Sequence, residues 1–69
     1  MNRDRIEGKW KELKGRVREK WGKLTDDELE TIGGKREKLA GILQQKYGIA
    51  KQEADRQIAQ FEKDIDRAA

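Results

Sequence analysis

The stretch Gly8-Lys-Trp-Lys-Glu-Leu-Lys-Gly-Arg-Val-Arg-Glu-Lys-Trp-Gly22 decides the fold, because the chain contains a second version of it. The second version, Gly34-Lys-Arg-Glu-Lys-Leu-Ala-Gly-Ile-Leu-Gln-Gln-Lys-Tyr-Gly48, begins 26 residues later. Three glycines, a central leucine and a terminal aromatic side chain keep their places in both versions. A repeat of this kind predicts one supersecondary unit that the chain uses twice.

The large apolar side chains around the first version recur at steps of three and four residues, the pattern of an amphipathic helix. They are Ile6, Trp10, Leu13, Val17, Trp21 and Leu24. Asn2 is a candidate N-cap, and Gly22 is a candidate residue for ending the helix in a left-handed conformation. We therefore expect one helix over about residues 3–21.

A capping box follows this helix. In Thr25-Asp-Asp-Glu28, the threonine side chain can accept from the backbone N–H of Glu28 while the glutamate reaches back to the N–H of Thr25. The box predicts a short helix over residues 26–32, which Gly33-Gly34 would end.

Two further helices are expected over about residues 35–47 and 51–66. The first would turn Leu39, Ile42, Leu43 and Tyr47 inward, and the second Ala54, Ile58, Phe61 and Ile65. The chain has no proline and no strand-like alternation of apolar and polar residues. We predict one all-α domain over residues 1–69: four helices that form two crossed helical hairpins with approximate internal two-fold symmetry.

The composition excludes several kinds of chemistry. Among 69 residues there is no cysteine and no histidine, which removes disulfides, the usual zinc ligands, the thiol nucleophile and the commonest general base. We predict no catalytic residues, no metal site and no cofactor. No apolar run reaches the ~20 residues that span a bilayer, and the N-terminus does not resemble a signal peptide. We expect a cytoplasmic protein, monomeric rather than oligomeric.

The positive charge of the chain is concentrated in its first third. The net charge is +3, but residues 1–24 carry nine Lys and Arg against four Asp and Glu. The candidate interaction surface is this basic first helix together with two glycines: Lys9, Lys11, Lys14, Gly15, Arg16, Arg18 and Gly41. The cations suit nucleic acid or an anionic surface. They equally suit a solvated helix face, because Glu7, Glu12 and Glu19 stand four residues before Lys11, Arg16 and Lys23.

Gly15 and Gly41 point away from the apolar faces of their helices, and a glycine inside a helix costs about 1 kcal/mol relative to alanine. Two interpretations remain open. In the first, the glycines form a low groove in which a partner backbone approaches closely. In the second, they simply weaken the helices or admit a close crossing by the last helix.

Several segments together resemble the CsbD-like family of small bacterial stress proteins. They are Asn2, the Gly8–Gly15 stretch, Trp21-Gly-Lys-Leu-Thr-Asp-Asp27, Gly34-Lys-Arg36 and Tyr47-Gly48. The resemblance implies a bacterial cytosolic protein of the general stress response with a four-helix fold of crossed hairpins. It supplies no established catalytic or binding residues. The chain departs from the family at Asp64-Ile-Asp-Arg-Ala-Ala69, which ends without an aromatic residue.

We therefore predict a non-enzymatic stress-response protein that acts by interaction with a partner. Two alternatives remain. One is a hydrophilin-like protectant, favoured by seven glycines and a mean hydropathy of −1.19. The other is a nucleic-acid or anionic-surface binder that uses the basic first helix.

Overall fold

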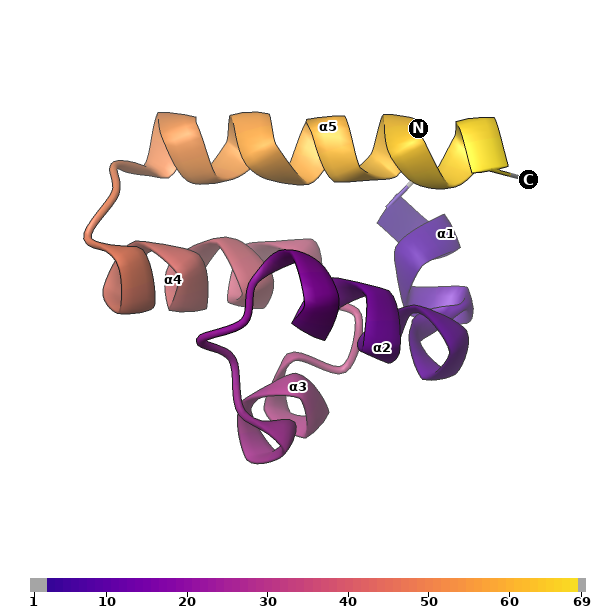
Figure 1. The fold of residues 1–69 in the computed structure, drawn as a ribbon, viewed down its shortest axis with the longest axis horizontal. Coiled ribbons are helices and arrows are strands. Elements are labelled where there is room, and N and C mark those ends of the chain that lie inside the picture. The colour runs from indigo at the N-terminus through magenta and orange to yellow at the C-terminus, as the bar shows by residue number, and fades with distance from the viewer. Residues whose placement is uncertain (1–2, 69) are drawn as a thin grey trace.

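A computed structural model describes residues 3–68, and the chain over this range is helical without strands (Figure 1). The five helices over these residues are α1 (Arg3–Gly8), α2 (Trp10–Lys20), α3 (Asp26–Ile32), α4 (Arg36–Tyr47) and α5 (Lys51–Ala68). The all-α class is confirmed, and α3, α4 and α5 lie within two residues of their predicted bounds. The predicted N-cap Asn2 lies outside the described residues.

The prediction of one helix over residues 3–21 is wrong, because the chain breaks between α1 and α2. Lys9 has φ −111° and ψ 15°, and its N–H donates to the carbonyl of Ile6 at 3.2 Å. Figure 1 shows α1 standing at a steep angle to α2. Gly34 packs against this break: a Cβ on Gly34 would lie 2.7 Å from the Cα of Glu7 and 3.1 Å from the Cβ of Trp10.

The four-helix arrangement with internal two-fold symmetry is also wrong. The second helix of the first unit, α3, has 7 residues, whereas its counterpart α5 has 18. Gly8 ends a helix, but its repeat partner Gly34 forms a turn with φ +85°. The repeat therefore keeps its central helix, since α2 and α4 begin 26 residues apart, but not the backbone conformation on either side of it.

The prediction that Gly22 ends the first helix in a left-handed conformation is wrong. Gly48 ends α4 in the left-handed region with φ +64°, but Gly22 is not among the glycines with positive φ. Instead α2 ends at Lys20, and its C-cap residue Trp21, with φ −119° and ψ 81°, has already left the helical conformation before the glycine is reached. The indole of Trp21, only 3% exposed, is turned into the core there.

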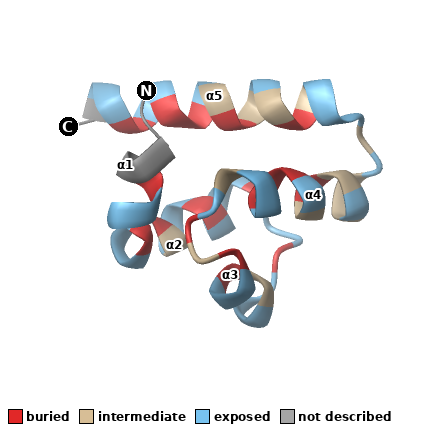
Figure 2. Ribbon diagram, turned by 180° about the vertical axis from the view of Figure 1, so that it is seen from behind, coloured by how far each residue is buried: buried red, intermediate tan, exposed pale blue. Residues whose placement is uncertain are grey.

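The centre of the core is the packing of α4 against α5, which run antiparallel (Figure 1), and α1, α2 and α3 add side chains to it. The buried faces of α4 and α5 are turned toward each other (Figure 2). Among the residues whose burial the structure describes, one cluster contains every buried apolar side chain: Ile6, Trp10, Leu13, Val17, Trp21, Leu24, Leu29, Ile32, Leu39, Ala40, Leu43, Ala54, Ile58, Phe61 and Ile65. Ile42, Tyr47 and Ile49 pack against it and stay partly exposed.

Trp10, Trp21 and Phe61 belong to this core. The indole of Trp10 donates to the carbonyl of Leu29 at 3.0 Å, and that of Trp21 donates to Oε1 of Gln57 at 2.9 Å. The rings of Trp21 and Phe61 lie 5.3 Å apart between centroids. Among the described residues no buried side-chain N or O atom lacks a hydrogen-bond partner, so the indole N–H groups can be buried without an unmet polar cost.

The capping box is confirmed at the start of α3. The N–H of Glu28 donates to Oγ of Thr25 at 3.2 Å, and the N–H of Thr25 donates to Oε1 of Glu28 at 2.9 Å. This exchange fixes the direction in which α3 leaves the loop after α2. It thereby sets the acidic first turn of α3 opposite the basic side of α2.

Candidate interaction surface

Two cations of the predicted basic surface are paired with acids of α3. Lys14 forms an ion pair with Glu30, and Nη1 of Arg18 lies 2.5 Å from Oδ1 of Asp26. Exposed pairs of this kind contribute about 0–1 kcal/mol each. Their larger consequence is electrostatic, since two of the charges expected to attract a polyanion already face carboxylates.

The same two pairs border an open hollow of about 440 Å³ between α2 and α3. Its lining residues are Lys14, Gly15, Arg18, Asp26, Leu29 and Glu30. Gly15 is exposed, and no heavy atom lies within 4 Å of the place where its Cβ would stand. The expectation that another helix crosses close to Gly15 or Gly41 is therefore wrong, because Gly41 is equally open.

The remaining predicted residues do not join this hollow. Lys9, Lys11 and Arg16 are exposed, and none of them has an ion pair or hydrogen bond from its side chain within the described part of the chain. Gly41 lies on α4 and is not among the residues that line the hollow. Of the predicted surface residues, only Lys14, Gly15 and Arg18 line this hollow in the described structure.

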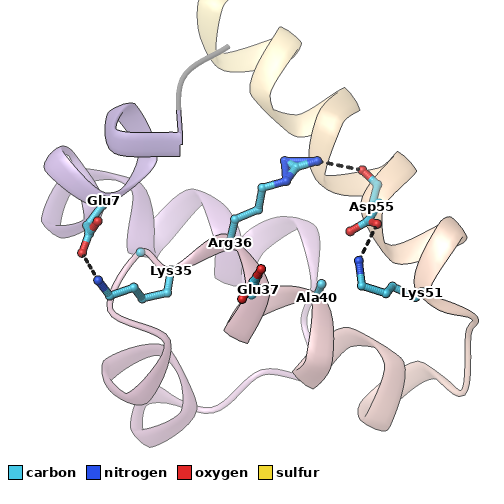
Figure 3. A pocket seen from close by; sticks show the side chains of 8 residues that line it. Glu7, Lys35, Arg36, Glu37, Ala40, Lys51 and Asp55 are labelled. Carbon is cyan, nitrogen blue, oxygen red and sulfur yellow. Dashed lines mark hydrogen bonds and ion pairs between the residues drawn. The ribbon is translucent and has the colours of Figure 1, made fainter.

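A second hollow, of about 330 Å³, was not expected from the sequence. It lies at the start of α4, beside the turn between α1 and α2 and the first turns of α5 (Figure 3). Its lining residues are Glu7, Gly34, Lys35, Arg36, Glu37, Ala40, Lys51 and Asp55. The only local signal was Gly33-Gly34-Lys35, a glycine pair before a helix whose first N–H groups lack partners within the helix.

The cations of this second hollow are each held by a neighbouring group. Nζ of Lys35 lies 2.6 Å from Oε2 of Glu7, and Nζ of Lys51 lies 3.0 Å from Oδ2 of Asp55. Arg36 donates to the backbone carbonyl of Asp55 at 3.4 Å (Figure 3). This arrangement ties α1, α4 and α5 together.

Arg36 also reaches Glu62, the one charged residue that is buried in the described part of the chain. Its Nη1 lies 3.1 Å from Oε1 of Glu62, a residue only 6% exposed. A carboxylate buried to this degree needs a charged or hydrogen-bonded partner. The Arg36–Glu62 pair is therefore part of the packing between α4 and α5.

Two carboxylates have clearly shifted acidity, and both shifts have structural causes. The pKa of Glu53 is lowered to about 2, first by hydrogen bonds from Arg56 and then by one from Gln57. The pKa of Glu28 is lowered by its hydrogen bond from Lys46 and by the N–H of Thr25. Both groups are half-buried and held in the ionised form, whereas a general acid at neutral pH needs a raised pKa. Among the described residues no three His, Cys, Asp or Glu side chains are grouped so that they could hold a metal ion.

The profile of the CsbD-like family matches residues 4–56. The chain belongs to the CsbD-like family. A UPF0337 protein of Nitrosomonas europaea is 53% identical over 68 residues, which cover 99% of this chain and 72% of that protein. A UPF0337 protein of Protochlamydia amoebophila is 52% identical over 62 residues, covering 90% of this chain and 94% of that protein.

The UPF0337 protein YjbJ of Escherichia coli K12 is 47% identical over 62 residues, 90% of each chain. These CsbD-like relatives are bacterial proteins whose names state no activity. No solved structure gives a significant match. Within residues 3–68 no helix is both long enough and apolar enough to cross a membrane.

Proposed function

We propose that this CsbD-like protein is a non-enzymatic, cytoplasmic stress-response protein that binds a protein partner through the hollow between α2 and α3. In this proposal residues 1–69 form a single domain that approaches its partner as a monomer. The observation that supports the proposal is the position of Gly15, a helical glycine that lines an open hollow with nothing near its missing side chain.

The fold itself has no need for glycine at position 15. Its φ is not positive, no neighbour would meet a Cβ there, and alanine would make α2 more stable by about 1 kcal/mol. A position without a side chain does, however, allow the backbone of a partner to approach the helix closely. The Lys14–Glu30 and Arg18–Asp26 pairs would then supply the polar rim that interfaces commonly have.

The hydrophilin-like alternative has less support from the structure. A protectant that works as a hydrated, partly disordered chain has no use for a dry core. Here the indoles of Trp10 and Trp21 are buried and both of their N–H groups are hydrogen-bonded. This favours a folded module with a defined surface.

The experiment fills the hollow without changing charge. Tagged wild type, Gly15→Gln and Gly41→Gln would be used to isolate partners from extracts of stressed cells of the source bacterium. Gly41 is the matched control, because it is a helical glycine in open space away from the hollow. We expect Gly15→Gln to lose a partner that wild type and Gly41→Gln both retain. If all three proteins retain the same partners, the hollow is not the binding site.

A further inference from the structure

Besides the paired Lys14 and Arg18, α2 and its N-cap residue Lys9 carry several cations without an ion pair to any described residue. Lys9, Arg16 and Lys20 are exposed, and none of them forms an ion pair within the described part of the chain. The Nζ of Lys20 lies over the ring of Trp21, 5.6 Å from the ring centroid. A cation over an aromatic ring keeps its full charge.

These three residues form a row that begins at the N-cap residue Lys9, directly before α2, and continues along the helix through Arg16 and Lys20. They are separated by seven and four residues, spacings that place side chains on the same side of an α-helix. At 1.5 Å per residue the row is about 17 Å long. Lys14 and Arg18 lie on the side of α2 that faces the acids of α3, so the row occupies the opposite flank.

A row of cations on a rigid helix is complementary to the regularly spaced phosphates of a nucleic-acid duplex. An amphipathic helix that binds an anionic membrane surface inserts its apolar face into the lipid. On α2 that face, formed by Trp10, Leu13 and Val17, is buried in the core.

The burial of the aromatic side chains also disfavours binding to single-stranded nucleic acid. Proteins that bind single strands without sequence preference stack bases on exposed aromatic rings. Trp10, Trp21 and Phe61 are buried, and the remaining aromatic residue, Tyr47, uses its hydroxyl to accept from the N–H of Lys23 at 3.1 Å.

We propose that the row Lys9–Arg16–Lys20 binds the phosphate backbone of duplex nucleic acid without sequence specificity. Glu12 and Glu19 border the row on the same helix, so the affinity is modest. Three neutralised phosphates give a slope of about −2.7 for the logarithm of affinity against the logarithm of salt concentration. Affinity then falls about 40-fold between 50 and 200 mM salt.

The experiment compares variants that lose equal charge. Binding to a fluorescent 20-base-pair DNA duplex would be measured by anisotropy at 50 and 200 mM salt for wild type and for Lys9→Gln/Arg16→Gln/Lys20→Gln. The matched control is Lys38→Gln/Lys63→Gln/Arg67→Gln, which removes three exposed cations from α4 and α5. A second control, Lys14→Gln/Arg18→Gln, removes the two paired cations. Circular dichroism would establish that each variant remains folded.

We expect the row variant to bind at least tenfold more weakly than wild type at 50 mM salt, while both controls stay within about threefold. The proposal is overturned if the control Lys38→Gln/Lys63→Gln/Arg67→Gln loses as much affinity as the row variant, since net charge alone would then explain binding. It is also overturned if the wild type shows no binding at 50 mM salt. Equal or tighter binding of an unpaired 20-base strand, or of phosphatidylserine vesicles, would likewise exclude a duplex site.

Discussion

Gly34 and Gly15 differ in what surrounds their missing side chains. Gly34 has φ +85° and stands where a Cβ would lie 2.7 Å from the backbone of Glu7. Gly15 is in a regular helix with nothing within 4 Å. One glycine is therefore required by the packing of α1 against the start of α4, and the other is not required by the fold at all.

Alanine at these two positions should have opposite effects on stability. Gly34→Ala introduces backbone strain and a clash with the main chain of α1, and we expect it to lower the free energy of unfolding by at least about 2 kcal/mol. Gly15→Ala should raise it by about 1 kcal/mol. Urea unfolding followed by circular dichroism measures both changes. A neutral Gly34→Ala would show that α1 does not pack on this turn in solution.

The lowered pKa of Glu53 predicts a loss of stability in acid. Its folded pKa is about 2, against an ordinary value of 4.5. The stabilisation that it provides is therefore present above pH 4.5 and is lost as the pH falls toward 2. Melting temperatures measured between pH 7 and pH 2 should decline more shallowly for Glu53→Gln than for wild type. Parallel declines would mean that the contact of Glu53 with Arg56 does not persist in solution.

At the scale of helices, local signals in the sequence identify α3, α4 and α5 but miss the break before α2. The capping box and Gly33 act within a few residues, so the sequence alone predicts both ends of α3. The apolar spacing from Ile6 to Trp10 continues through the break without interruption. The break lies where Gly34 packs against Glu7 and Trp10. This contact joins distant parts of the chain, and a local sequence pattern does not predict such contacts.

The Arg36–Glu62 pair joins α4 to α5, and removing one of its two charges should lower the free energy of unfolding. Arg36→Met leaves the carboxylate of Glu62, whose side chain is only 7% exposed, without its charged partner. We expect a loss of about 2–3 kcal/mol, because an unpaired buried charge is strongly unfavourable. The matched control Lys51→Met breaks the exposed Lys51–Asp55 pair and should change stability by less than about 1 kcal/mol.

The double variant Arg36→Met/Glu62→Leu distinguishes charge from packing. It removes both charges together, so most of the lost stability should return. Urea unfolding of the two single variants, the double variant and wild type completes the cycle. A double variant as unstable as Arg36→Met alone would show that the loss comes from packing of the arginine stem.

At the scale of the whole molecule, the sequence predicts the core better than it predicts the surface. Steps of three and four residues identify most of the buried apolar side chains, because burial follows helix periodicity. The predicted basic surface is divided in the structure: Lys14 and Arg18 form ion pairs with acids of α3, whereas Arg16 forms none with the described residues. Which flank of α2 faces α3 depends on how the helices pack, and helix periodicity leaves that packing undetermined.

The size of the molecule in dilute buffer separates a folded interaction module from a hydrated protectant. The radius of gyration over Cα atoms is 10.9 Å, close to the ~11 Å expected of a folded 69-residue chain, whereas an unfolded chain would give ~25 Å. Small-angle X-ray scattering should therefore give a value near the folded one. Circular dichroism and tryptophan fluorescence should show one coincident urea transition, because Trp10 and Trp21 lie in the same core as the helices. A radius well above the folded value, together with a gradual loss of helix, would favour the protectant and would leave the hollow at Gly15 without a stable frame for a partner.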